Sequence, residues 1–143
     1  MEGMPFRPVT WDMDGIDPVS KGHRVLVVDD EPEVVWVLEL ALGSEGYDVC
    51  TARNGVEAMA QISAKHPELM VLDVMMPRMD GWSVMRELAK LPADERPRVV
   101  MVTALASGSD RATALELGVD AYVPKPFDMD ELLGVIHGLQ KAS

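Results

Sequence analysis

Five short apolar segments recur along this sequence, each followed by a longer segment with helical character. They are RVLVV (24–28), YDVCTA (47–52), LMVLD (69–73), RVVMV (98–102) and AYV (121–123). Most are apolar at consecutive positions and rich in β-branched residues, which is typical of strands covered on both faces. Strands that alternate with helices over short connections predict a parallel sheet. The expected fold is therefore α/β, a doubly wound (βα)5 unit with a five-stranded parallel sheet.

The segments between these strands carry helical stripes and end signals. Asn54 and Asp128 stand where two helices are expected to begin, and Gly46 and Gly118 stand where helices are expected to stop. Residues spaced by three or four positions predict the buried face of each helix. The predicted stripes are Val34, Val37, Leu38 and Ala41; Val56, Met59, Ala60 and Ser63; and Leu132, Val135, Ile136 and Leu139.

The first part of the chain differs in composition from the rest. Residues 1–22 contain Pro5, Pro8 and Pro18 with scattered acidic residues, and they show no sustained period. We expect residues 1–22 to form an N-terminal extension and residues 23–141 to form one domain, because 143 residues suit a single domain of ordinary size.

Charge and cysteine content exclude several function classes. The formal net charge of -11 would repel a polyanion, so direct binding of nucleic acid is not expected. The single cysteine, Cys50, cannot form an internal disulfide, and the sequence has neither a secretory signal nor an apolar stretch long enough to cross a bilayer. A cytoplasmic protein without membrane association is expected.

Polar side chains follow the predicted strands at one edge of the sheet. In an open parallel sheet, ligands bind beyond the carboxyl ends of the strands, where the strand order reverses. The residues at these ends are Asp29, Asp30 and Glu31 after the first strand, Asp73 at the third, Thr103 after the fourth and Lys125 after the fifth.

These residue types predict a phosphoryl acceptor site that uses a metal. Converging carboxylates repel one another, and a hard cation such as Mg²⁺ relieves this repulsion with oxygen ligands. Asp29, Asp30 and Asp73 are the predicted metal ligands. A carboxylate can attack phosphorus to form an acyl phosphate, and Asp73 is best placed to do so. Lys125 and Thr103 would contact the oxygens of the added group.

Four motifs together resemble the receiver domain of two-component response regulators. They are VLVVDDEP, LMVLDVMMPRMDG, VVMVTA and DAYVPKPF, and the resemblance extends from about Arg24 to about Leu139. It implies the flavodoxin-like receiver fold and a phosphoprotein of a phosphorelay, with Asp73 phosphorylated by a histidine kinase, a histidine phosphotransfer protein or a small phosphodonor. The protein would not be an enzyme beyond assisting its own phosphorylation and dephosphorylation.

The resemblance also implies roles for individual residues. The backbone carbonyl of Met75 would complete the protein ligands of Mg²⁺, and Asp29 would help through water. Thr103 and Tyr122 would form a switch pair, and the Lys125–Pro126 peptide bond would be cis. No output module follows the last predicted helix, so two alternatives stay open: a stand-alone regulator that acts on a downstream protein target as a monomer or weak homodimer, or a fragment of a larger chain.

Two other functions stay open at this point. The segment DMDG (12–15) looks like the DxDG nucleophile loop of haloacid-dehalogenase-like phosphatases, which use a related fold. However, the three residues between Pro8 and Asp12 are too few for a buried strand, and Ile16 stands where that motif would have threonine. The other alternative is an interaction domain that is never phosphorylated, which the complete set of site residues disfavours.

Several residues have structural or kinetic interpretations. Cys50 is expected to be an unreactive core thiol, and Trp36 and Trp82 are expected to pack on helices. Met75 and Leu105 each lie two residues after a predicted site residue, and their apolar side chains should hinder attack by water. We therefore expect a long-lived phosphorylated state.

Overall fold

Strands and helices alternate along the whole of the chain that the structure describes, which is residues 23–105 and 107–141 of a computed structural model. The elements, in chain order, are β1 (Arg24–Val28), α1 (Pro32–Ser44), β2 (Asp48–Ala52), α2 (Gly55–Lys65), β3 (Leu69–Leu72), α3 (Gly81–Leu88), a 3-10 turn η1 (Ala93–Glu95), β4 (Arg98–Thr103), α4 (Gly108–Glu116), β5 (Ala121–Pro124) and α5 (Met129–Lys141). Within these ranges no helix combines the length and the apolar composition needed to cross a bilayer.

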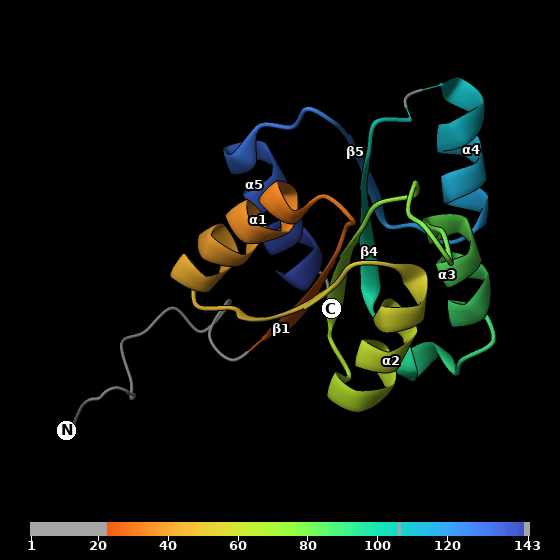
Figure 1. Ribbon diagram of the computed structural model, residues 1–143, viewed down its shortest axis with the longest axis horizontal. Coiled ribbons are helices and arrows are strands. Elements are labelled where there is room, and N and C mark those ends of the chain that lie inside the picture. The colour runs from red at the N-terminus through yellow and green to blue at the C-terminus, as the bar shows by residue number, and fades with distance from the viewer. Residues whose placement is uncertain (1–22, 106, 142–143) are drawn as a thin grey trace.

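The strands form one five-stranded sheet in the order β2-β1-β3-β4-β5, and every pairing is parallel. The chain moves from β1 to one side to make β2, and then returns to the other side of β1 to make β3 (Figure 1). The strand order therefore reverses between β1 and β3. The predicted doubly wound (βα)5 fold is confirmed.

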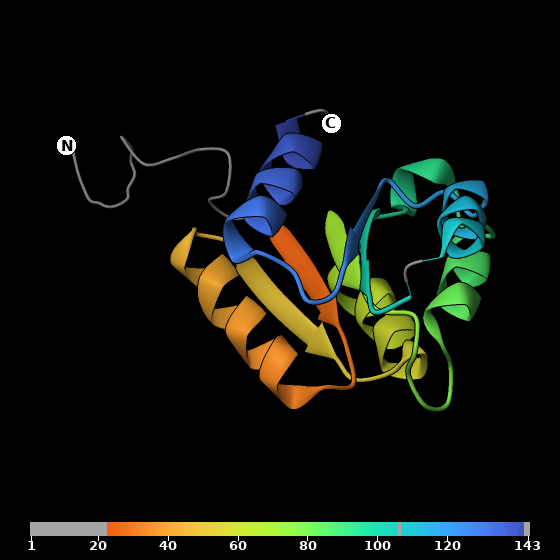
Figure 2. The same ribbon diagram turned by 90° about the horizontal axis from the view of Figure 1, so that it is seen from above.

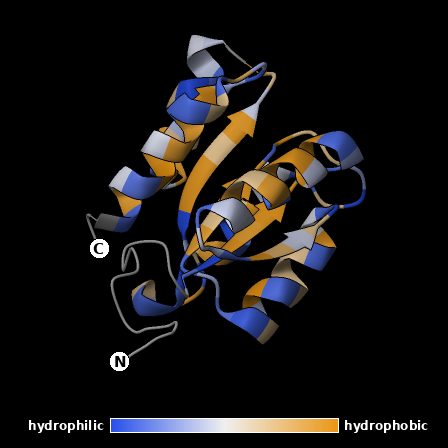
Figure 3. Ribbon diagram, turned by 90° about the vertical axis from the view of Figure 1, so that its left-hand side faces the viewer, coloured by the Kyte–Doolittle hydropathy of each residue, from blue (hydrophilic) through white to orange (hydrophobic). Residues whose placement is uncertain are grey.

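Helices cover both faces of the sheet. Figures 1 and 2 show α1 and α5 on one face and α2, α3 and α4 on the other. Successive strand residues point to opposite faces, so Leu26 and Met70 join the core under α2, α3 and α4, while Val27 and Val71 join the core under α1 and α5. Figure 3 shows the strands as a largely hydrophobic layer between helices that carry both hydrophobic and hydrophilic residues.

The predicted helix ends are confirmed. The side chain of Asn54 accepts a hydrogen bond from the N–H of Glu57 at 2.9 Å, and that of Asp128 accepts one from Glu131 at 3.1 Å. Both bonds satisfy backbone donors in the first helical turn. Gly46 and Gly118 follow α1 and α4 with φ of 96° and 93°, a conformation that glycine adopts without steric cost.

Three of the four residues predicted on the buried stripe of α2 are exposed, and only Met59 packs against the core. Val56 is 46% exposed, and Ala60 and Ser63 are also exposed; the buried residues of this helix are Gly55, Ala58 and Ile62. The N–H of Gly55 donates to the carbonyl of Met79 at 2.8 Å, and a Cβ at position 55 would lie 2.4 Å from that oxygen. This close contact with the loop before α3 fixes the rotation of α2 and turns Val56 outward.

Two packing predictions on α1 and β2 also need correction. Leu38 and Leu42 are buried on α1, so Trp36 and Val37 point away from the sheet, and Trp36 is 61% exposed. Cys50 is half-buried and not fully buried, because β2 is the edge strand of the sheet. The half-buried Trp82 packs against the core as predicted, and so does the stripe on α5.

Candidate functional site

The predicted acidic residues lie at the carboxyl edge of the sheet, at the reversal between β1 and β3. Asp29 directly follows β1, and Asp73 directly follows β3. The N–H of Asp73 donates to the carbonyl of Val28 at 3.0 Å, and the N–H of Asp29 donates to that of Ala52 at 3.1 Å. These bonds continue the parallel pairing by one residue, so the backbone of the sheet itself sets the spacing of the two carboxylates.

Backbone contacts with Val74 and with the start of α3 fix the position of Asp73. Its side chain is nearly buried, and one carboxylate oxygen accepts a 2.7 Å hydrogen bond from the N–H of Val74. The N–H of Gly81, at the start of α3, donates to the carbonyl of Val74 at 2.8 Å. A Cβ on Gly81 would lie 2.4 Å from the carbonyl oxygen of Asp73, so only glycine permits this approach of α3. The other carboxylate oxygen of Asp73 faces Lys125.

The ammonium group of Lys125 joins three carboxylates. Its Nζ lies 2.7 Å from Asp29, 2.7 Å from Glu31 and 3.1 Å from Asp73. The backbone N–H of Lys125 donates to the carbonyl of Thr103 at 2.9 Å, which ties the residue to the end of β4. The Lys125–Pro126 peptide bond is cis, as expected.

Burial and charge act on these groups in opposite directions. Burial raises the pKa of Asp29, although hydrogen bonds from Lys125 and from the N–H of Glu31 partly oppose this rise. Burial alone would lower the pKa of Lys125, but its hydrogen bonds with Asp29 and Glu31 and the charge of Asp73 raise that pKa above its ordinary value. Lys125 therefore stays charged at neutral pH.

The carboxylates also suit a hard divalent cation. Oxygens of Asp29, Asp30 and Asp73 lie within 4.8 Å of one another, and Asp30 is exposed and open to solvent. Together with Glu31, these carboxylates leave a formal excess of three negative charges over the single ammonium of Lys125. Oxygen donors with uncompensated negative charge and one solvent-facing ligand fit Mg²⁺, which keeps several of its waters.

Thr103 and Tyr122 are linked through the loop after β4. Thr103 is fully buried, and its hydroxyl accepts a 3.3 Å hydrogen bond from the N–H of Leu105. The hydroxyl of the half-buried Tyr122 donates to the carbonyl of the same Leu105. Burial raises the pKa of Tyr122, the charge of Asp110 raises it further, and Arg111, which lies 4.9 Å from the ring centre, opposes the rise.

An open hollow of about 480 Å³ lies beside the acidic cluster. Asp30, Met75 and Leu105 are among its lining residues, and the side chain of Met75 is 62% exposed. The structure thus brings together Asp29, Asp30, Asp73 and Lys125, places Thr103 on the neighbouring strand, and sets Tyr122 on β5, one strand further out. The backbone carbonyl of Met75 stays a predicted ligand.

One contact at the site was not predicted from the sequence. Glu31 was interpreted only as part of the acidic loop, yet its carboxylate pairs with Lys125. The signal was present, because Glu31 follows Asp29 and Asp30 directly at the same strand end. The DMDG segment that resembles a phosphatase loop lies in residues 1–22, outside the described residues.

Comparison with known proteins gives one consistent result. The sequence model of the response regulator receiver domain matches residues 25–137. A protein of Porphyridium aerugineum named "Probable transcriptional regulator ycf27" is 44% identical over 125 residues, covering 85% of this chain and 51% of that protein. "Response regulator MprA" of Mycobacterium avium (strain 104) is 44% identical over 116 residues, covering 81% and 50%. The chain spans about half the length of the curated relatives it matches.

Solved structures agree with these sequence matches. The receiver domain of the Francisella response regulator 1452 superposes with a TM-score of 0.78 at 31% identity, covering 85% of this chain and 98% of that one. The BeF3-activated receiver domain of Klebsiella pneumoniae RstA gives a TM-score of 0.75 at 28% identity, covering 82% and 98%.

Proposed function

Because the chain belongs to the response regulator receiver domain family of two-component signalling, we propose that Asp73 is its phosphoryl acceptor and that phosphorylation changes its binding to a partner protein. The observation that carries this proposal is the placement of Lys125, which follows β5 and whose ammonium reaches the carboxylates of Asp29 and Asp73. This arrangement puts a fixed positive charge beside the carboxylate that would accept the group.

The proposed donor is a phosphohistidine on a histidine kinase or a histidine phosphotransfer protein. A carboxylate oxygen of Asp73 attacks phosphorus, a P–O bond forms, the P–N bond breaks, and the electron pair of that bond returns to the imidazole of the donor. The side chain of Lys125 contacts a phosphoryl oxygen and balances part of the added charge. The hydroxyl of Thr103 donates to another oxygen.

Magnesium is part of the proposed site. When bound, the cation would neutralise charge on the phosphoryl oxygens. Asp29, Asp30 and Asp73, with the backbone carbonyl of Met75, would hold it. The backbone of the chain positions the carboxylate ligands. Gly81 and Val74 position Asp73, and the parallel pairing of β1 with β3 positions Asp29.

Output is proposed to pass through Thr103 and Tyr122. Phosphorylation adds roughly two negative charges, and movement of the Thr103 hydroxyl toward the new oxygens would release the N–H of Leu105. The carbonyl of Leu105 accepts from Tyr122, so this loop would carry the change to the face formed by α4, β5 and α5. The result is a population shift between two arrangements.

The remaining parts of the proposal concern the whole protein. We propose that residues 23–141 form the receiver unit, that residues 1–22 extend it, and that the protein works in the cytoplasm as a monomer or weak homodimer. A downstream protein would be its target, without direct contact to nucleic acid or membrane. It would not act on other substrates, and would assist only its own phosphorylation and dephosphorylation.

The alternatives have weaker support. A phosphatase that uses Asp12 would need a strand before it, and the carboxyl edge of the sheet already holds Asp29 and Asp73 beside Lys125. An interaction domain that is never phosphorylated would have no use for a nearly buried Asp73 next to an ammonium group.

Intact mass measurement tests the proposed function. Incubation with acetyl phosphate and MgCl₂ should add the mass of one phosphoryl group, and the adduct should be absent in Asp73→Asn and after removal of Mg²⁺ with EDTA. Asp94→Asn is the matched control, because Asp94 is an exposed aspartate in η1 and belongs to neither the acidic cluster nor the hollow beside it. Continuous phosphate release without an adduct would favour the phosphatase, and a folded protein without either would favour the interaction domain.

A further inference from the structure

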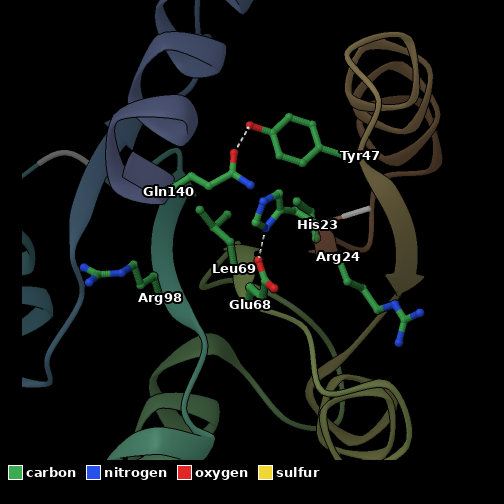
Figure 4. A pocket seen from close by; sticks show the side chains of 8 residues that line it. His23, Arg24, Tyr47, Glu68, Leu69, Arg98 and Gln140 are labelled. Carbon is green, nitrogen blue, oxygen red and sulfur yellow. Dashed lines mark hydrogen bonds and ion pairs between the residues drawn. The ribbon is translucent and has the colours of Figure 1, made fainter. Parts of the chain in front are cut away.

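Hollows open at both edges of the sheet, and their linings differ in chemistry. At the amino edge lies a narrow hollow of about 20 Å³, and several of its lining residues pair with one another. Figure 4 shows the hydroxyl of Tyr47 bonded to Gln140 and the ring of His23 bonded to Glu68. The hollow beside the acidic cluster is wider, about 480 Å³, and apolar side chains form most of its lining. Polar groups thus satisfy each other at the amino edge, whereas apolar side chains meet solvent at the carboxyl edge.

Met75 differs in its surroundings from the other methionines that the structure describes. It is 62% exposed, and it belongs to neither of the two hydrophobic clusters. The other described methionines all pack in one of these clusters and are buried or half-buried; they are Met59, Met70, Met76, Met79, Met85, Met101 and Met129. Among the described methionines, Met75 is therefore the one that solvent reaches most freely.

The exposed side chain of Met75 also forms part of the wall next to the proposed acceptor site. Met75 is the second residue after Asp73 in the sequence. It lines the hollow beside the acidic cluster together with Asp30, Trp82 and Leu105. Asp30 belongs to the acidic cluster and is exposed. A change in the polarity of Met75 would therefore change the polarity of a surface that borders the acidic cluster.

An exposed thioether is open to two-electron oxidation by a peroxide. A lone pair of the sulfur attacks one oxygen of hydrogen peroxide, an S–O bond forms, the O–O bond breaks, and the other oxygen leaves as water after proton transfer. Thioether and peroxide thus give sulfoxide and water, without a further reactant. The sulfoxide is polar, and methionine sulfoxide reductases convert it back to the thioether. The modification therefore changes an apolar side chain reversibly into a polar one.

From these observations we propose that Met75 is an oxidation site, at which peroxide makes the wall of the hollow beside the acidic cluster polar. The sulfoxide oxygen accepts hydrogen bonds from water, so oxidation hydrates this wall. The consequence for signalling rests on the proposed function. Water then reaches the phosphoryl group on Asp73 more readily, and the phosphorylated state becomes shorter-lived. An oxidant thus returns the switch to its unphosphorylated form.

Peptide mapping after brief exposure to hydrogen peroxide tests the site itself. Trypsin cuts after Lys65 and Arg78. The resulting peptide contains the exposed Met75, the half-buried Met76 and the buried Met70, so one peptide compares all three. Sulfoxide should form on the order of tenfold faster at Met75 than at Met70, because oxidation follows exposure, and unfolding in urea should make the rates equal. Equal rates in the folded protein, or faster oxidation of Met76 than of Met75, would overturn the proposal.

The fluorescence of Trp82 measures the change in polarity without any phosphorylation, because Trp82 and Met75 line the same hollow. In a Trp11→Phe/Trp36→Phe background, Trp82 is the remaining tryptophan. Oxidation should move its emission to longer wavelength. Adding Met75→Leu keeps an apolar side chain that peroxide does not oxidise, so the emission of that variant should not move. The same shift with and without Met75 would contradict the proposed hydration of the hollow.

The lifetime of the phosphoryl adduct tests the link to signalling. Peroxide treatment should shorten the lifetime in the parent by a factor of about three or more, because water gains access to a wall that was apolar. Met75→Leu should have the same lifetime before and after peroxide, whereas Met129→Leu, which removes a methionine on α5, should respond as the parent does.

Two failures can be told apart. An adduct whose lifetime in the parent does not change on oxidation overturns the link between Met75 and the switch. If no adduct forms in any variant, the proposed function fails and the link fails with it. The peptide map and the emission of Trp82 then still decide whether Met75 is the oxidation site.

Discussion

The hydroxyl of Tyr122 on β5 donates a hydrogen bond to the backbone carbonyl of Leu105, in the loop that follows β4. The N–H of the same Leu105 donates to the hydroxyl of Thr103. One residue of this loop therefore contacts both members of the proposed switch pair, so a movement of either side chain changes a hydrogen bond made by Leu105.

Tyr122→Phe removes this hydroxyl and keeps the ring. We expect the phosphorylated mass adduct to form at close to the parent rate, because Tyr122 lies outside the acidic cluster. The amide shifts that phosphorylation causes in α4, β5 and α5 should shrink, and Tyr122→Ala should abolish phosphorylation-dependent partner binding. Two-dimensional NMR with and without phosphodonor measures the first effect. Undiminished shifts and unaffected binding would remove Tyr122 from the switch.

Gly81→Ala tests the contact between α3 and Asp73. The added Cβ would lie 2.4 Å from the carbonyl oxygen of Asp73, and such overpacking costs about 1–3 kcal/mol in the free energy of unfolding. Adduct formation should also slow, because the backbone of Asp73 must move. Gly134→Ala in α5 is the control, since a Cβ there meets no atom within 4 Å; it should stabilise the protein by roughly 0.5–1 kcal/mol. Equal unfolding curves for both variants would contradict the close packing.

Lys125→Gln tests the fixed positive charge. The carboxylates of Asp29, Glu31 and Asp73 would lose their shared partner, and the rate of adduct formation with acetyl phosphate should fall at least about tenfold, or about 1.4 kcal/mol in activation free energy. Lys90→Gln removes an exposed lysine that pairs with Glu87 on α3 and should change the rate little. A parent-like rate in Lys125→Gln would exclude a direct contact with the phosphoryl group.

The lifetime of the adduct tests the role of the apolar side chains in the hollow beside the acidic cluster. Met75 and Leu105 both line this hollow, and their side chains should limit the approach of water to the phosphoryl group. Met75→Asn and Leu105→Glu should each shorten the lifetime, followed by intact mass after removal of the phosphodonor. Lifetimes equal to that of the parent in both variants would contradict the hypothesis that Met75 and Leu105 limit attack by water.

The thiol of Cys50 should react slowly with a thiol reagent. Burial raises its pKa, so at pH 8 a smaller fraction is thiolate than in a free cysteine peptide. The rate with Ellman's reagent should lie below that of the peptide, and its rise with pH should occur at higher pH. The folded state favours the protonated thiol. The free energy of unfolding should therefore fall as the pH rises from the pKa of Cys50 in the unfolded chain to its higher pKa in the folded protein. A rate equal to that of the urea-unfolded protein would contradict the shielding.

The parallel (βα)5 sheet and the residues at its carboxyl edge followed well from the sequence, because both depend on rules that govern the backbone. Continuous apolar runs predicted covered strands, and parallel strands must bring their carboxyl ends to one edge, so Asp29, Asp73 and Lys125 could be placed together. Helix rotation was less predictable. The exposure of Val56 follows from the contact between Gly55 and Met79, which lie far apart in the sequence.

The sequence predicted which residues form the site better than it predicted the individual contacts between them. Lys125 was expected to face Asp73, but its bond to Glu31 depends on the path of the loop between β1 and α1. The link between Thr103 and Tyr122 uses the backbone N–H and carbonyl of Leu105. Any residue type supplies these groups, so no side-chain pattern in the sequence predicts the link.

The alternation of side chains along the central strands has a consequence for how this sequence can change over time. Neighbours such as Leu26 and Val27 belong to separate hydrophobic clusters, one on each side of a single layer of backbone. Substitutions in the two clusters touch different side chains, so their effects on stability should add. The residues of each cluster can then be substituted independently during evolution, under selection for partner binding or for solubility. The backbone that the two clusters share keeps Asp29 and Asp73 in register.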